Sequence, residues 1–113
     1  PLGDTPDLVR NHPALADLEI PRTGEPCTHL IGPLVTGTLV VMGECGFHRT
    51  PAGRGAMLRA YDKTTGDEVG AVFMPAPQSG SPMTYLAGGR QYIVLAVSGR
   101  GYPGEYLAFR LPS

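Results

Sequence analysis

Hydrophobic and polar residues alternate over short runs along most of this chain, a pattern typical of β-strands rather than helices. The runs are rich in β-branched and aromatic residues, and glycine- or proline-containing stretches separate them. They span residues 34–36, 38–42, 56–62, 69–74, 82–86, 91–97 and 105–111. The sequence therefore predicts an all-β fold built of antiparallel meanders.

The runs fall into two groups. Residues 33–74 hold four predicted strands, a length close to one blade of a β-propeller, which takes ~40–50 residues. Residues 75–113 hold three more and lack a fourth, outer strand. Residues 1–32 are expected to be irregular apart from a short helix near Pro6 that ends before Pro13. The glycine-rich stretch 43–55 is expected to be a long loop.

The order of strands in a meander decides which loops share an end of the sheet. Residues 44–55, 75–81 and 98–104 should cluster at one end, joined by the segment 24–32, whereas the turn 62–66 lies at the other. The ionisable residues expected at the shared end are Glu44, His48, Arg49, Arg54 and Arg100.

Four stretches resemble a known family. The motif Ala60-x-Asp62-x-x-x-Gly66 resembles the first part of the repeated docking motif of quinoproteins, the pyrroloquinoline-quinone (PQQ) dependent sugar and alcohol dehydrogenases. The stretches at residues 81–85, 90–94 and 105–112 resemble the last blade and closing strand of that family, and of membrane glucose dehydrogenases in particular. The resemblance implies about two blades of an eight-bladed propeller at the C-terminal part of a dehydrogenase. In that family the end where such loops cluster carries the PQQ pocket, so the resemblance makes this end the predicted functional end.

The resemblance also implies cofactors and a location. PQQ and Ca²⁺ would serve the full-length parent, and the calcium ligands and catalytic Asp would come from blades outside this chain. No catalytic residue or metal ligand is therefore expected here. In the family an N-terminal strand closes the final blade, so the remaining blades or partner chains are the expected partners, and the expected location is the periplasm.

Three residues are candidates for contact with PQQ at the rim of its pocket. Arg100 stands where membrane glucose dehydrogenases carry a His, and its guanidinium would pair with one of the three PQQ carboxylates, or it is a solvated loop cation. His48 would be a general base or proton carrier, or an ordinary exposed histidine. Glu44 is the third candidate.

The docking motif departs from the family pattern at one position. The family carries Trp where this chain has Gly70, and the whole chain contains no Trp. Asp62 is interpreted as a side chain that caps its turn, with Gly66 at positive φ. The missing Trp favours a second hypothesis, a propeller fragment that acts as a non-catalytic binding or scaffolding module. A third hypothesis is a free-standing small β-protein that assembles into a ring.

Composition excludes several other classes. The formal net charge is −1 with no charged block, which offers no electrostatic attraction for nucleic acid. No apolar run approaches the ~20 residues of a membrane helix. Cys27 and Cys45 lack metal-site spacing and are interpreted as unpaired thiols, with a disulfide as the alternative. An isolated pair of blades would leave apolar faces in water, so the chain is expected to be a fragment or a subunit completed by partners.

Overall fold

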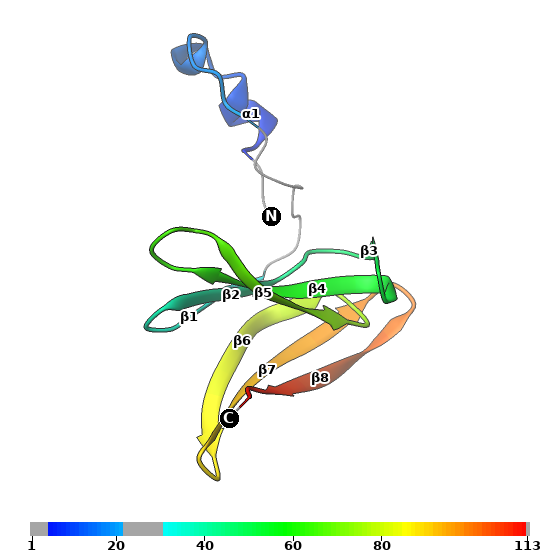
Figure 1. Ribbon diagram of the computed structural model, residues 1–113. Helices are drawn as coiled ribbons and strands as arrows, with labels where there is room; N and C mark the ends of the chain where they lie inside the picture. The colour runs from blue at the N-terminus through cyan, green and yellow to red at the C-terminus, as the bar shows by residue number, and fades with distance from the viewer. Residues whose placement is uncertain (1–4, 22–30, 113) are drawn as a thin grey trace.

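Two antiparallel sheets make up most of the chain in a computed structural model, which describes residues 5–21 and 31–112 (Figure 1). Before the sheets lie a short helix α1 (Asp7–Arg10) and a 3₁₀ helix (Pro13–Leu15). Pro6 takes the N-cap position of α1 without a side-chain cap, and the acidic Asp7 lies in the first turn, where it suits the helix dipole. The predicted all-β class is confirmed.

The first sheet holds the four strands predicted between residues 33 and 74. They are β1 (Leu34–Val35), β2 (Leu39–Gly43), β4 (Gly53–Asp62) and β5 (Glu68–Met74), paired in that order. Asp62 caps the turn between the last two: its Oδ1 accepts hydrogen bonds from the N–H groups of Thr64 and Thr65 at 2.8 and 2.9 Å. Gly66 closes the turn with φ 79°.

A further strand, β3 (His48–Thr50), corrects the expectation of a long loop between residues 43 and 55. It pairs with the first three residues of β4 in a tight hairpin. The Thr50 hydroxyl holds the turn, since it donates to the Gly53 carbonyl at 2.7 Å and accepts from the Ala52 N–H at 3.2 Å. A three-residue strand next to glycines has no alternation to reveal it in the sequence.

The second sheet has three strands in the order β6 (Gln78–Ala87), β7 (Arg90–Gly99) and β8 (Tyr102–Arg110). Gly88 and Gly89 connect the first two with φ 56° and 72°, as a two-residue type I′ hairpin requires. β6 begins at Gln78, earlier than the predicted start at Pro82, and its pairing is irregular between Ser79 and Met83. Within residues 31–112 no fourth strand pairs with β8.

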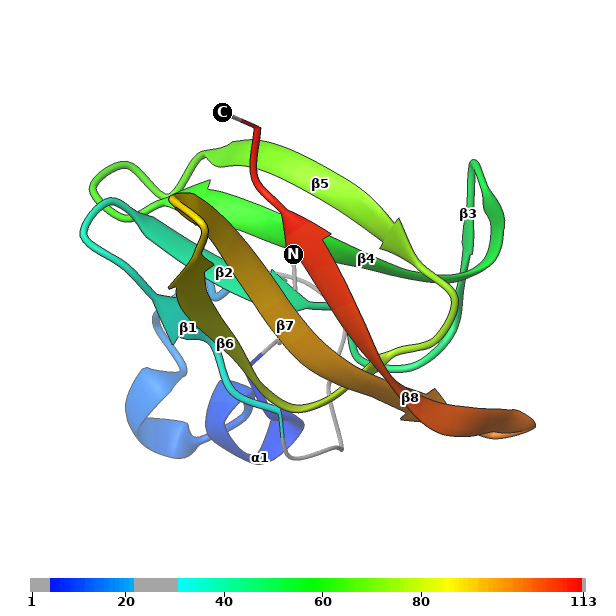
Figure 2. The same cartoon turned by 90° about the horizontal axis from the view of Figure 1, so that it is seen from below.

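The two sheets face each other, as the two views of the ribbon show (Figures 1 and 2), and the hydrophobic core lies between them. It consists of Val41, Ala56, Leu58, Met74, Ala76, Ile93, Leu95 and Val97. On the outward faces of the sheets, by contrast, large apolar side chains are exposed to solvent: Val35 is 58%, Met83 54% and Tyr106 82% exposed. Tyr85 and Tyr92 stack on the outward face of the second sheet with ring centroids 5.2 Å apart. Each sheet thus buries one face against the other and leaves apolar side chains bare on the opposite face, as expected for a partial propeller.

Candidate functional site

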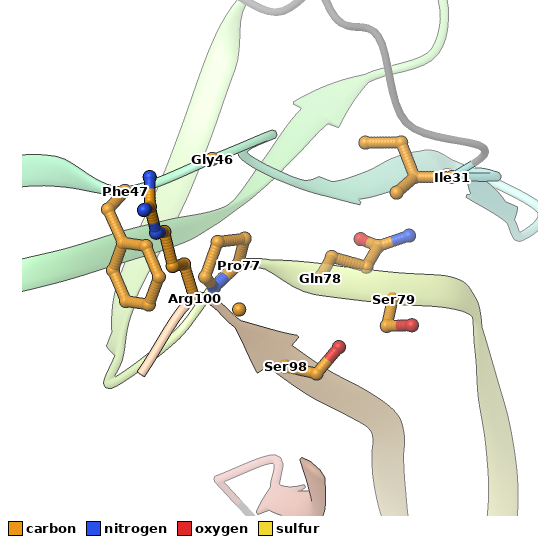
Figure 3. A pocket seen from close by; sticks show the side chains of 9 residues that line it. Ile31, Gly46, Phe47, Pro77, Gln78, Ser79, Ser98 and Arg100 are labelled. Carbon is orange, nitrogen blue, oxygen red and sulfur yellow. The ribbon is translucent and has the colours of Figure 1, made fainter. Parts of the chain in front are cut away.

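Three loops meet at one end of the two sheets and enclose a hollow of about 390 Å³. They are the loop before β3, the connection from β5 to β6 and the turn after β7, the same loops that strand order predicts to cluster. The lining residues are Ile31, Gly46, Phe47, Pro77, Gln78, Ser79, Ser98, Gly99 and Arg100 (Figure 3). Of the approach segment 24–32, residues 24–30 lie outside the described residues.

The side chain of Gln78 links three chain segments beside this hollow through hydrogen bonds. Its side chain is buried, with 3% of the residue exposed. Its Nε2 donates to the carbonyls of Gly32 and Gly80 at 2.7 and 2.8 Å, and its Oε1 accepts from the Gly43 N–H at 2.5 Å. The amide group is thus fully engaged in linking β2, β6 and the approach to β1. Sequence reasoning missed Gln78 because it stands among prolines and small polar residues that look like a loop.

Phe47 forms one wall of the hollow, where its ring packs against the end of β7. A Cβ atom placed on Gly99 would lie 2.3 Å from this ring, so only glycine allows the approach. On the ring lies the guanidinium of Arg54, with its Cζ 3.7 Å from the centroid. Arg100 stands nearby on the rim with its side chain exposed. Within the described part of the chain Arg100 forms no ion pair.

Glu44 and His48 do not line the hollow that Arg100 lines. They share a separate hollow of about 370 Å³ with Arg59 and Met57. The imidazole of His48 donates from Nε2 to the Cys45 carbonyl at 3.0 Å, since a carbonyl can only accept. The structure therefore does not bring the three predicted rim residues together.

The Glu44 carboxylate is already engaged. Its Oε1 pairs with Arg59 Nη2 at 2.9 Å and its Oε2 accepts from the Met57 N–H at 3.0 Å. Arg59 in turn binds Glu68 at 2.7 Å. Burial raises the pKa of Glu44, but the hydrogen bonds from Arg59 and Met57 and the positive charges of Arg59 and His48 together outweigh burial and lower it. Glu44 thus stabilises the outward face of the first sheet.

This pairing predicts a pH dependence of stability. Because the folded-state pKa of Glu44 is lowered, its contribution is present above the ordinary carboxyl pKa and is lost as the pH falls through the lowered value. Glu44→Gln should lower the free energy of unfolding by about 1 kcal/mol at neutral pH, a value reduced for solvent screening, and by much less in acid. Urea denaturation across this pH range measures it, with Glu19→Gln at an exposed position as the control. A penalty that did not change with pH would contradict the ion pair.

The cysteines correct one expectation. Cys45 is disulfide-bonded, so its interpretation as an unpaired thiol is wrong, and Cys27 lies outside the described residues. Sequence gives no measure of the distance between two α-carbons, which decides whether a disulfide forms.

In residues 5–21 and 31–112 no group of three or more His, Cys, Asp or Glu side chains is placed to hold a metal ion. His12 accepts from the Ala14 N–H at 3.1 Å, and His29 falls outside those ranges. The helices of this described part are too short to span a membrane.

Comparison with known proteins gives one consistent family. A family model described as the β-propeller domain of glucose, ethanol and alcohol dehydrogenases, named for PQQ, matches residues 1–93. That match covers most of the chain. The chain belongs to this family.

Curated relatives agree with the PQQ dehydrogenase propeller. Methanol dehydrogenase (cytochrome c) subunit 1 of Paracoccus denitrificans is 36% identical over 75 residues, which cover 66% of this chain and 11% of that protein. Quinoprotein glucose dehydrogenase of Escherichia coli strain K12 is 32% identical over 85 residues, 71% of this chain and 10% of that protein. No solved structure matches the chain significantly. The chain spans about a tenth of the length of these relatives.

The departure from the family motif has a visible effect in this PQQ-family propeller. Gly70 pairs with Ala60, and a Cβ atom built on Gly70 would meet nothing within 4 Å. An apolar groove of about 590 Å³ runs beside it between the two sheets. Its walls include Leu39, Val69, Val72, Phe109 and Leu111. The family pattern has a Trp side chain at the position of Gly70, and in this chain that position is open space.

Proposed function

We propose that the chain is the C-terminal part of a PQQ-dependent dehydrogenase that oxidises a sugar or an alcohol. Residues 33–74 form a complete blade in this proposal, and residues 75–113 form the final blade, which lacks its outer strand. Residues 1–32 form the segment that leads into them. Other blades or partner chains complete the ring and cover the outward faces.

The observation that carries the proposal is the hollow at the end where the loops converge. Arg100 presents five N–H donors at its rim, near Gly46 and Phe47, without a partner among the described residues. This guanidinium fits one carboxylate of PQQ, whereas the amide of Gln78 is engaged in hydrogen bonds within the chain. When bound, PQQ would supply a quinone that accepts a hydride from the carbon bearing the substrate hydroxyl, while the proton comes from that hydroxyl.

The residues of this chain would hold and orient one edge of the cofactor rather than perform the chemistry. Arg100 would neutralise a carboxylate, and Phe47 and Pro77 would exclude water from the adjacent wall. The described residues contain no carboxylate cluster for a metal, so we place the Ca²⁺ ligands and the catalytic Asp in the other blades.

Arg100→Ala in the full-length protein that carries this chain should weaken PQQ binding about tenfold, because one charge-assisted hydrogen-bonded pair is lost. Titration of the apoprotein with PQQ, followed by the recovery of dye reduction, measures the change. Arg90→Ala, on the exposed turn at the other end of the second sheet, is the matched control. Equal affinity in wild type and Arg100→Ala would show that Arg100 is a solvated loop cation.

The enzyme activity itself is tested by reconstituting that protein with PQQ and Ca²⁺ and offering a panel of aldoses and primary alcohols. Dye reduction with at least one of them is the expected result. The second candidate function, a binding or scaffolding module, is favoured by Gly70, which leaves the inter-sheet groove unfilled. Absence of activity across the panel would favour that candidate.

The proposed location is the periplasm. The disulfide at Cys45 supports an oxidising compartment, since disulfides persist there and are rare where thiols are kept reduced.

A further inference from the structure

A two-stranded ribbon extends beyond the first sheet. Its strands are β3 and residues 53–55 of β4, which pair with each other alone. The rest of β4, residues 56–62, pairs with β2 and β5. Figures 1 and 2 show β3 standing away from the two sheets. Neighbouring blades pack on the faces of a sheet, so they leave such a projection accessible.

The ribbon carries an unfavourable charge pair. Arg49 and Arg54 are register partners on the two strands, and both are exposed. Like charges directly opposite each other destabilise a strand pair. Neither arginine forms an ion pair with a described acidic residue, and the nearby Glu44 is taken by Arg59. The repulsion would be relieved by carboxylates from outside the chain.

The guanidinium of Arg54 is fixed in an orientation that suits the binding of a carboxylate. The Arg54 guanidinium lies over the Phe47 ring at 3.7 Å, which fixes its plane and leaves the N–H groups at its edge free. A hollow of about 550 Å³ opens beside it, lined by both arginines, Phe47, His48 and the turn of the hairpin. A planar fork of donors next to a second guanidinium is suited to paired carboxylates.

We propose that this ribbon is a docking surface for an acidic segment of another protein, whose carboxylates bind Arg49 and Arg54. Charge complementarity selects the partner, and the projection of the ribbon makes it reachable by a macromolecule. The hollow is open rather than enclosed, which suits a chain lying across it. The inference does not depend on PQQ or on a dehydrogenase activity.

Fluorescence anisotropy with a labelled peptide of alternating Asp and Gly, at about 0.15 M ionic strength, tests the surface. The full-length protein that carries this chain should bind the peptide, and Arg49→Ala/Arg54→Ala should weaken binding about tenfold. Arg90→Ala removes an equal charge at the opposite end of the molecule and should leave affinity unchanged. The double variant removes a like-charge pair but also the contact of Arg54 with Phe47, so its thermal stability should stay close to that of the wild type, which shows that the fold is kept.

Three results would overturn the proposal. One is an affinity that the double variant does not change or that Arg90→Ala lowers equally. Another is binding of free succinate as tight as binding of the peptide, which would indicate a small-anion site. The third is absence of peptide binding to the full-length protein, which would mean that carboxylates of the same propeller already cover the ribbon.

Discussion

Gln78→Ala should lower the free energy of unfolding of the chain by about 4 kcal/mol. The substitution removes three hydrogen bonds and leaves the Gly43 N–H and the Gly32 carbonyl without their partner. A buried polar group without a partner costs more than the bond itself contributes, so the loss exceeds that of an exposed glutamine. Urea denaturation followed by circular dichroism measures it.

Gln91→Ala is the matched control for this prediction. Gln91 is half-buried in β7 and donates to the Thr84 hydroxyl at 2.9 Å, but it links only neighbouring strands of one sheet. Its replacement should cost about 1 kcal/mol. Equal losses for the two glutamines would contradict the role assigned to Gln78. A selective loss for Gln78→Ala would show that the functional end depends on this one amide.

Gly55→Ala should be the second most damaging change, with a loss of about 3 kcal/mol. A Cβ atom at this position would lie 2.3 Å from the backbone carbonyl oxygen of Met74 and 2.5 Å from the Phe73 ring. Backbone cannot move aside as a flexible side chain can, so β4 and β5 would have to separate where the ribbon begins. The same urea denaturation measures the loss.

Gly70→Ala serves as its control, because both glycines lie in strands of the first sheet and only one is crowded. A methyl group at Gly70 has open space around it, and the backbone there does not need glycine. This change should be neutral or raise stability by up to about 1 kcal/mol. If the two variants were equally destabilised, the packing of β4 against β5 described above would be wrong.

The strands could be predicted from the sequence because their side chains alternate. In β4, Leu58 faces the core whereas Met57 and Arg59 face outward, and that period of two is visible without coordinates. The residue sequences of the Asp62 turn and of the last two strands indicated the family, which the family model and the relatives confirm. The loops that meet at the functional end followed from strand order alone.

The rest depends on contacts between residues distant in sequence. Nothing local shows that Glu44 pairs with Arg59, or that Gln78 reaches back to Gly32 across 46 positions. β3 was missed because glycines next to a short strand carry no pattern. For the same reason the sequence could not show that Arg100 lines one hollow whereas Glu44 and His48 line another.

The central claim is that these two sheets are neighbouring blades of a larger propeller. A crystal structure of the complete polypeptide tests it most directly. We expect both outward faces, including Val35 and Met83, to be covered by further sheets, and a strand from elsewhere to pair with the free edge of β8. A structure in which those faces and that edge remain in solvent would contradict the claim.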